Sequence, residues 1–410
     1  MTHKQKPLVN SAPKIFFAHG PGDAAGTLQN WALNVEDDSI IAKTYSGQVF
    51  DIAKQLGSEL LVITDNSKSH TLTADNISVE SCPRGDMGSG WKYWLNMKKH
   101  ADSIARRANE FEADVAIVSL HYGLLSLAAF RKYQIPVILD MHNTLWPMGF
   151  EPNLFKRLIL KVTTMRGRNG LGAVVAVSPE CGRQLNKLIG EKSIFEHIPQ
   201  YPVSLQYLNV DNKFISSSEN GEFRILFAGR IEKIKGVFDV LDAAEILIRE
   251  GYSHVKWIFA GTGSAECELK TEIERRNLSP YLELKGQLCR MDLTEELVKA
   301  NATITPTRAG FCEGSAKAPL ESLIAGIPAL LSSVVPASEV VKDAAIIFSP
   351  SSPAEIANSV SQMLDNHLHY VSLCENSGKL KHLLFEKQFS FKNAVLGALK
   401  KTLGQSLLTL

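Results

Sequence analysis

The sequence predicts an α/β fold of two domains, each built on a doubly wound parallel sheet covered by helices. The chain has 410 residues, which is long for one domain and suits two of about 200 residues each. Hydrophobic residues make up 45% and charged residues 21%, the balance of a packed globular protein. Short apolar runs alternate with helical patterns, and this alternation begins twice along the chain.

The first series of apolar runs predicts strands over residues 14–18, 59–64, 114–119, 136–140 and 173–178. Each run is four to six residues long and rich in Val and Ile. Amphipathic stretches such as residues 48–56 separate the runs. Buried parallel strands joined by crossover helices have this pattern.

A second series predicts strands over residues 223–228, 255–260, 282–285, 302–305, 329–332 and 344–348. Residues 201–222 lie between the two series and contain the polar run SSSENGE, which has the composition of a linker. We therefore expect a first Rossmann-like domain over residues 1–205 and a second over 206–388, facing a cleft. Ligands of such folds bind at the carboxyl ends of the strands.

Composition excludes several classes of protein. The chain has 44 basic and 43 acidic residues, so nothing global indicates a nucleic-acid partner. Six scattered cysteines without CxxC spacing favour reduced thiols over a disulfide framework or a zinc site. Without a signal-peptide core or a run of eighteen apolar residues, we expect a cytoplasmic protein. Peripheral contact with the inner face of a membrane stays open. Lys98, Lys99 and His100 could form a basic helix face for such contact, but a solvated basic face is the simpler interpretation.

Four motifs follow one another over residues 223–350: FAGRIEKIKG, FAGTGSAECELK, LELKGQL with ANATITPT, and EGSAKAPLESLIAGIPAL. In this order they resemble the retaining GT-B glycosyltransferases of family four, the glycosyl transferases group 1. The first half of the chain matches only in outline. The resemblance implies transfer of a hexose-type sugar from a UDP- or GDP-sugar to a carbohydrate or lipid-linked acceptor, as in surface polysaccharide or glycoconjugate synthesis. It also implies a final helix within residues 389–410 that crosses back to the first domain.

The first two motifs indicate where the donor diphosphate would bind. Arg230, after Gly229, and Lys235 would place one cation on each side of the leaving diphosphate, where charge develops. The plainer interpretation is a solvated basic loop. The Gly-x-Gly turn supplies Gly261 and Gly263 next to the ligand. No Asp-x-Asp triplet occurs in the chain, so we expect no metal and no other cofactor, with cationic side chains in its place.

The fourth motif carries two glutamates, Glu313 and Glu321. Eight helical residues rise about 12 Å, so these carboxylates cannot act as one acid–base couple. Glu321 would instead accept from the ribose hydroxyls and Glu313 from the sugar ring. Without the flanking motifs, a helix acid and a surface acid would explain them equally well. Phosphate would bind backbone amides near the helix N-terminus and a lysine beside them: Gly314, Ser315, Ala316 and Lys317.

The first domain contributes three weaker candidates. Gly22 lies in the glycine-rich run HGPGDAAG, where the backbone can approach a phosphate or sugar closely, although a turn without a ligand is a simpler reading. Gly47, at a helix start, resembles a family glycine that lies against the donor phosphate. His142 follows the strand at residues 136–140, where the family places a histidine near the donor sugar or acceptor. A lone histidine such as His121 is more often structural.

Alternatives from other classes remain open at this point. A GT-B nucleotide-sugar 2-epimerase would share the architecture, and a catalytically silent binding module would share the site. An NAD-dependent oxidoreductase fits less well, because Asp65 lies about forty residues beyond the glycine-rich run where about twenty are expected. In the glycosyltransferase family, the departing phosphate oxygen takes the acceptor proton by front-face displacement. That mechanism requires no protein nucleophile, and the chain shows no obvious one.

Overall fold

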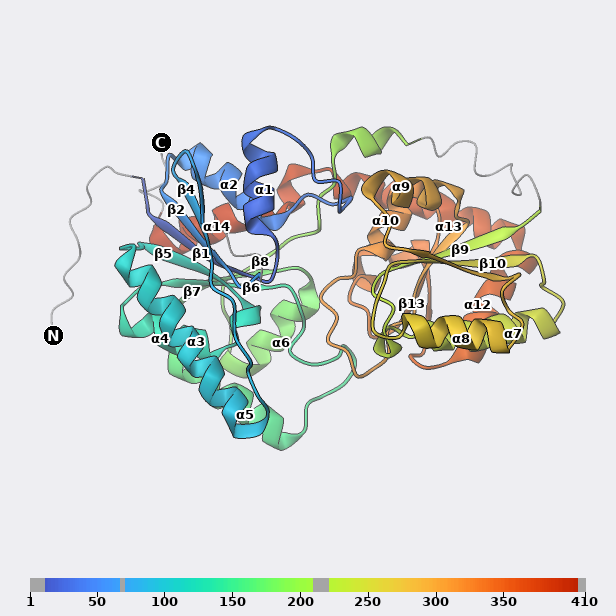
Figure 1. The fold of residues 1–410 in the computed structure, drawn as a ribbon, viewed down its shortest axis with the longest axis horizontal. Coiled ribbons are helices and arrows are strands. Elements are labelled where there is room, and N and C mark those ends of the chain that lie inside the picture. The colour runs from blue at the N-terminus through green and yellow to red at the C-terminus, as the bar shows by residue number, and fades with distance from the viewer. Residues whose placement is uncertain (1–11, 67–70, 209–220, 405–410) are drawn as a thin grey trace.

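The computed structural model describes residues 12–66, 71–208 and 221–404, and it shows two α/β lobes side by side (Figure 1). The eight-stranded sheet of the first lobe has the order β3-β4-β2-β1-β5-β6-β7-β8. Its strands are β1 (Ile15–Gly20), β2 (Leu60–Thr64), β3 (Leu72–Ala74), β4 (Ile77–Ser81), β5 (Val115–Ser119), β6 (Val137–Met141), β7 (Leu171–Ala176) and β8 (Ile194–Glu196). The helices between them are α1 (Ala24–Ala32), α2 (Tyr45–Leu56), α3 (Gly90–Glu110), α4 (Leu125–Lys132), α5 (Leu154–Gly167) and α6 (Pro179–Ile189).

The second lobe has a six-stranded sheet in the order β11-β10-β9-β12-β13-β14. Its strands are β9 (Phe223–Ala228), β10 (Val255–Ala260), β11 (Leu282–Gly286), β12 (Ala302–Thr305), β13 (Ala329–Ser332) and β14 (Ala345–Phe348). Its helices are α7 (Val237–Arg249), α8 (Glu266–Arg275), α9 (Arg290–Lys299), α10 (Ala318–Ala325), α11 (Ser338–Val341), α12 (Pro353–Asp365) and α13 (His367–Leu380). Every ladder in this sheet is parallel. The predicted class of two doubly wound parallel-sheet domains is therefore confirmed.

The predicted strands are all found, each within two residues of its expected ends. Central strands are buried on both faces: Ile15, Phe16, Phe17 and Ala18 of β1 are 0% exposed. Covering both faces with helices makes such strands read as continuous apolar runs. The sequence analysis missed β3, β4 and β8, which lie toward the sheet edges, where partial exposure interrupts the apolar run.

The last helix, α14 (Phe391–Leu403), packs on the first lobe (Figure 1). It lies against β7, β8 and α2. Its buried face, which includes Phe391, Val395 and Leu399, joins the core cluster that contains Phe17 of β1. The first core is therefore completed by residues from the far end of the chain. Within the part of the chain that the structure describes, no helix is both long and apolar enough to cross a membrane.

The imidazole of His197, just after β8, is buried in this core beside α14. Its ring lies edge-on to Phe391, with centroids 5.0 Å apart, and to Tyr45, at 5.4 Å. Neither ring nitrogen has a hydrogen-bond partner among the described residues. Burial, with a further contribution from His142, lowers the pKa of His197 well below its usual 6.5.

We predict that this histidine makes the protein less stable in mild acid. The unfolded chain takes up a proton below about pH 6.5 while the folded chain does not, so the free energy of unfolding should fall as pH decreases from about 7 to about 5. Urea unfolding across this range should show a shallower fall for His197→Gln than for the parent chain. The exposed His369 provides the control, and an equal change of slope in His369→Gln would contradict the assignment.

Candidate active site

The main cavity has a volume of ≈540 Å³ and lies at the carboxyl ends of the second sheet, with one wall from the first domain. Eight of the fourteen residues predicted from sequence line this cavity: Gly229, Arg230, Lys235, Gly261, Glu313, Ala316, Lys317 and Glu321. They come from the ends of β9 and β10, from the loop after β12 and from α10. The fold therefore brings together residues that are up to ninety-two positions apart in the sequence.

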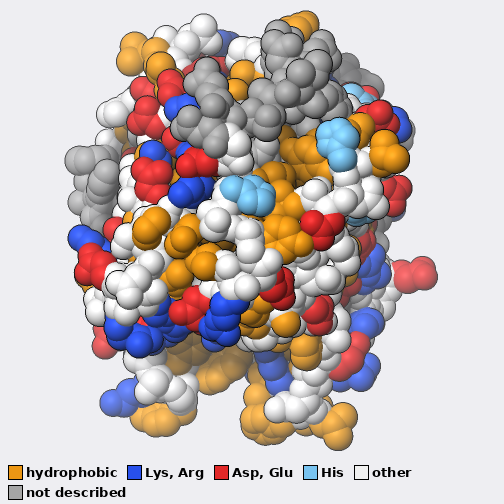
Figure 2. Space-filling view, turned by 90° about the vertical axis from the view of Figure 1, so that its right-hand side faces the viewer, with side chains coloured by type: hydrophobic (Ala, Val, Ile, Leu, Met, Phe, Trp, Pro, Cys, Tyr) orange, Lys and Arg blue, Asp and Glu red, His pale blue; other side chains and the backbone are white. Residues whose placement is uncertain are grey.

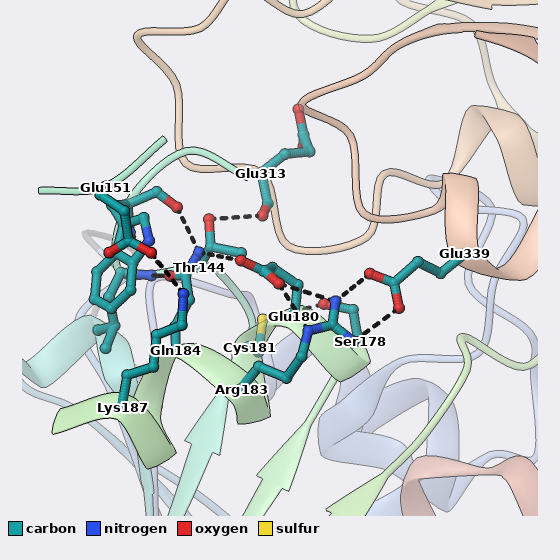
Figure 3. A network of polar contacts seen from close by, with 12 residues as sticks. Thr144, Glu151, Ser178, Glu180, Cys181, Arg183, Gln184, Lys187, Glu313 and Glu339 are labelled. Atoms are coloured by element: carbon teal, nitrogen blue, oxygen red, sulfur yellow. Dashed lines mark hydrogen bonds and ion pairs between the residues drawn. The ribbon is translucent and has the colours of Figure 1, made fainter. Parts of the chain in front are cut away.

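Glu313 is held from both sides of the cleft. Its carboxylate oxygen Oε2 accepts from Lys235 Nζ at 2.7 Å and from Thr307 Oγ1 at 3.0 Å. Its backbone carbonyl accepts from the hydroxyl of Thr144, in the first domain, at 3.1 Å. Figure 3 shows the carboxylate pointing away from Thr144 while the carbonyl faces it. Because both hydrogen bonds to this carboxylate end on Oε2, Oε1 is the oxygen left for a ligand.

The two predicted cations differ in how firmly they are held. Lys235, in the 3₁₀ turn Lys233–Lys235, is 15% exposed and lies 4.0 Å above the centre of the Phe311 ring. Arg230 is 59% exposed and pairs with Glu232 at 2.6 Å. Its guanidinium also lies 5.8 Å from the Phe311 ring centre. Lys235 is therefore a fixed charge in the cavity, and Arg230 is a solvated charge at its edge.

The N-terminus of α10 opens into the same cavity. No side chain caps it, and among the described residues no acceptor is found for the backbone amides of Ala316, Lys317 and Ala318. Ala316 has a positive φ of 66°. Free amides at a helix N-terminus, with a lysine beside them, form a site for an anion.

Glu321 lies one turn into α10 and is only 6% exposed. Burial raises the pKa of this carboxyl above its usual 4.5, while Lys317 and Tyr201 act in the opposite direction. Tyr201 is itself buried, and its pKa is also raised, first by burial and then by Glu321. The carboxyl is therefore a buried acceptor in the wall of the cavity.

The Gly-x-Gly turn serves packing as well as the cavity. Gly261 has a φ of +141°, and a Cβ there would lie 2.0 Å from the carbonyl oxygen of Gly229. A Cβ on Gly263 would lie 2.3 Å from the carbonyl oxygen of Ile231. Both glycines let the loops after β9 and β10 touch, and of the two only Gly261 also lines the cavity.

Gly314, Ser315 and His142 lie behind the cavity wall, not along it. A Cβ on Gly314 would lie 1.7 Å from the carbonyl oxygen of His142, so this glycine lets the two domains touch. The ring of His142 stacks on Tyr45, with centroids 4.6 Å apart, and its Nε2 lies 2.5 Å from Asp140 Oδ2. Ser315 is buried, and its carbonyl accepts from the Ala337 amide.

Gly22 and Gly47 line two further cavities. Gly22 lines one of ≈250 Å³ that shares Ser39, Ile40 and Lys317 with the main cavity. Gly47 lines a third of ≈510 Å³, and its amide donates to Thr44 Oγ1 at 3.2 Å as part of the cap of α2. Neither glycine lines the main cavity, and both of their cavities adjoin it, since the third shares Ile40 and Ile41 with the main cavity.

Several cavity residues were not foreseen from the sequence. The first domain reaches across with Ser39, Ile40 and Ile41. Their loop is tied to the start of α9, where the Arg290 amide donates to the Asp38 carbonyl at 2.7 Å and its guanidinium pairs with Glu36 at 2.5 Å. No local signal marks this loop, because its role arises from contact with the other domain.

A second polar network joins the domains beside the first (Figure 3). Arg183 on α6 binds Glu339 on α11 through two hydrogen bonds and also pairs with Glu180. The Gln184 side chain accepts from the amides of Leu145 and Trp146 at 2.8 and 3.1 Å. Gln184 of α6 thus fixes the loop that contains Thr144. Among the described residues, no cluster of three or more His, Cys, Asp or Glu side chains is arranged to hold a metal ion.

Comparison with known proteins agrees with this arrangement. Residues 210–380 match the family model described as glycosyl transferases group 1. No curated protein matches the sequence. Sucrose-phosphate synthase from Thermosynechococcus elongatus has a TM-score of 0.69 at 14% identity, covering 95% of this chain and 99% of its own.

Two further solved structures are similar over nearly the whole length. The UDP-forming α,α-trehalose-phosphate synthase from Burkholderia vietnamiensis has a TM-score of 0.73 at 11% identity, covering 97% of this chain and 99% of its own. The HepE protein of Anabaena, solved with UDP, has a TM-score of 0.63 at 16% identity, covering 97% and 100%. At these identities the likeness establishes the fold alone, and the family match concerns residues 210–380. The chain therefore has the GT-B fold, and residues 210–380, which form most of its second domain, match the model of the glycosyl transferases group 1.

Proposed function

We propose that the chain is a retaining, metal-independent hexosyltransferase that takes its sugar from a UDP- or GDP-sugar. The observation that carries this proposal is the convergence of Lys235, Glu313, Lys317 and Glu321 on one cavity between the domains. Among similar structures, HepE of Anabaena is solved with UDP and glucose, and an Escherichia coli protein is solved with UDP-2-fluoro glucose. These neighbours favour UDP over GDP as the donor nucleotide.

We propose one orientation for the donor in the cavity. The ribose hydroxyls would donate to Glu321, and the diphosphate would accept from the free amides of Ala316, Lys317 and Ala318 at the start of α10. Lys235 would lie on the other side of the diphosphate, with Arg230 able to swing in from the edge. The sugar ring would then reach Glu313, whose Oε1 is available to accept from its hydroxyls.

The proposed reaction depends on positive charge that the protein holds in place beside the diphosphate. Breaking the glycosidic bond leaves a diphosphate with added negative charge, which Lys235 and the amides of α10 would stabilise without moving. Because Glu313 Oε2 is already bonded to Lys235 and Thr307, its carboxylate serves better as a hydroxyl acceptor than as a nucleophile. This supports a mechanism in which the departing phosphate oxygen receives the acceptor proton.

The acceptor would bind on the side of the first domain. The cavity that contains Gly22 adjoins the donor cavity through Lys317, Ser39 and Ile40. We propose a carbohydrate or lipid-linked acceptor there, used in surface polysaccharide or glycoconjugate synthesis. The family resemblance supports this assignment, and Tyr45 and His19 supply the polar and aromatic groups of the wall.

The first prediction concerns Lys235. Lys235→Ala should lower the transfer rate by about 10²- to 10³-fold, since it removes a fixed charge from the leaving diphosphate. Glu313→Ala should abolish transfer by removing the contact with the sugar. Both variants should remain folded by circular dichroism, with a lower thermal unfolding temperature than the parent chain, because each removes one partner of a largely buried ion pair. Lys233→Ala is the matched control, because Lys233 lies in the same turn but is 63% exposed and paired with Glu268. If Lys235→Ala turned over the donor as fast as the parent chain, the role assigned to Lys235 would be wrong.

The second prediction concerns Glu321. Calorimetry should show that Glu321→Gln binds UDP more weakly, because an amide accepts fewer ribose hydrogen bonds than a carboxylate. Because the pKa of Glu321 is raised, protonation removes this acceptor at a higher pH than for an ordinary glutamate. UDP affinity of the parent chain should therefore fall on acidification more steeply than that of Glu321→Gln. Equal affinity and equal pH dependence in the two proteins would show that the ribose contact is wrong.

The third prediction separates the donors and tests the need for a metal. The purified protein, assayed for binding and hydrolysis across UDP-, GDP- and ADP-sugars, should prefer a UDP-sugar. Its rate should be the same with EDTA, since the proposal assigns the role of a metal ion to cationic side chains. Loss of activity in EDTA that is restored by a divalent cation would refute the metal-independent assignment.

A further inference from the structure

Helix α5 turns its apolar side chains outward. Only Thr164 and Gly167 of its fourteen residues are buried. A surface helix ordinarily directs its apolar stripe to the core. The large side chains that α5 leaves exposed are, with their exposed fractions, Leu154 (85%), Phe155 (73%), Leu158 (59%), Val162 (43%) and Met165 (53%).

Packing against α4 fixes which face of α5 points outward. Gly167 approaches α4 so closely that a Cβ there would lie 2.2 Å from Cβ of Leu127. At 3.6 residues per turn, Leu154, Leu158, Val162 and Met165 form one stripe on the opposite side of the helix. The exposed stripe is therefore set by the fold and is not a frayed end.

The start of α3 has the same character. Trp91, Tyr93, Trp94 and Leu95 are 72%, 38%, 45% and 42% exposed, and burial of this helix begins only at Met97. Among the described residues, nineteen large hydrophobic side chains are exposed, and ten of them lie in residues 91–95 and 150–165. Figure 1 shows α5 and the first turns of α3 at the lower end of the first lobe. Figure 2 shows hydrophobic side chains on two projections at that end, with Lys and Arg side chains nearby.

The charge of this surface has one sign. Residues 90–100 contain three lysines and no acid, and α5 contains four basic residues and no acid. None of these seven side chains forms an ion pair with another described residue. The nearest acids along the chain are engaged elsewhere: Asp86 accepts from the Gly88 amide, Asp102 pairs with Lys132, and Glu151 pairs with Lys187. The half-buried His100 instead stacks on Tyr122, so Lys98 and Lys99 form the basic face without it.

We propose that α5 and the first three turns of α3 form a docking surface for a membrane that contains anionic phospholipid. Exposed Trp, Leu and Phe side chains fit the boundary between headgroups and acyl chains, and the lysines and arginines fit the anionic headgroups. A second copy of the chain fits less well, since pairing this surface with itself would oppose seven cations to seven cations. The rest of the chain balances this charge, which is why the net charge is only +1.

The docking surface adjoins the candidate active site. The segment that leads into α5 begins beside the candidate site, because the hydroxyl of Thr144 donates to the backbone carbonyl of Glu313 at 3.1 Å. Helix α5 starts at Leu154, ten positions after Thr144. A chain docked through α5 would therefore hold the mouth of the cleft near the headgroups, where a lipid-linked acceptor is found. Docking itself does not depend on the proposed function.

The test is flotation of the full chain with vesicles of phosphatidylcholine, either alone or mixed with phosphatidylglycerol. The chain should float with the mixed vesicles and not with phosphatidylcholine alone, and added salt should weaken binding. Each cation near an anionic surface contributes about fivefold, so Lys156→Gln/Arg157→Gln/Lys161→Gln should weaken binding roughly a hundredfold. Phe155→Ser/Leu158→Ser should also release the chain. Leu368→Ser, at an 80% exposed site in the second domain, should have no effect.

Three results would overturn the proposal. They are binding of the parent chain to neither vesicle, equal binding to both vesicles, and a dimer in solution that Phe155→Ser/Leu158→Ser disperses. Circular dichroism would reveal whether Phe155→Ser/Leu158→Ser misfolds. If it does, Lys156→Gln/Arg157→Gln/Lys161→Gln still tests the proposal, because it changes only exposed side chains. UDP binding by the parent chain, measured alongside, separates the two proposals, because a chain that binds UDP and no vesicle contradicts docking alone.

Discussion

The position of Glu313 depends on both domains at once, and most of the candidate site depends on Glu313. Its carboxylate is fixed by Lys235 and Thr307 from the second domain, while its backbone carbonyl is fixed by Thr144 from the first. Gly314 beside it permits the contact, because any side chain there would collide with the carbonyl of His142. The residue proposed to bind the sugar is thus placed only when the domains are in contact. The geometry of the proposed sugar-binding residue and the contact between the domains therefore depend on the same hydrogen bonds.

The sequence predicted the cavity-lining residues of the second domain far better than those of the first. Its four motifs each lie at the end of a strand or the start of a helix, so local sequence and position in the sheet together identify Lys235, Glu313, Lys317 and Glu321. The loop with Ser39 to Ile41 could not be found in this way, because it lines the cavity only through contact with α9 of the other domain. The same limit applies to His142, which lies behind Tyr45 and not along the cavity wall.

The sequence also predicted only in part which strands and helix faces are buried. The buried strands were found because two covered faces produce an unbroken apolar run. Helix α5 has an apolar stripe of ordinary helical spacing, and spacing alone predicts that such a stripe faces the core. The structure places it in solvent, since the close contact of Gly167 with α4 turns the opposite face inward. A near-zero net charge likewise conceals a surface on which all seven charges are positive.

The return of α14 to the first domain has a consequence for synthesis of the chain. The first sheet is complete once β8 has been made, but the helix that covers Phe17 and its neighbours begins 195 residues after Glu196, at Phe391. At about 5–20 residues per second, the ribosome needs roughly 10–40 s to make the intervening segment. Throughout that interval the first domain lacks one wall of its core and exposes an apolar groove. The nascent chain is therefore most open to aggregation and to chaperone binding while its second domain is being translated.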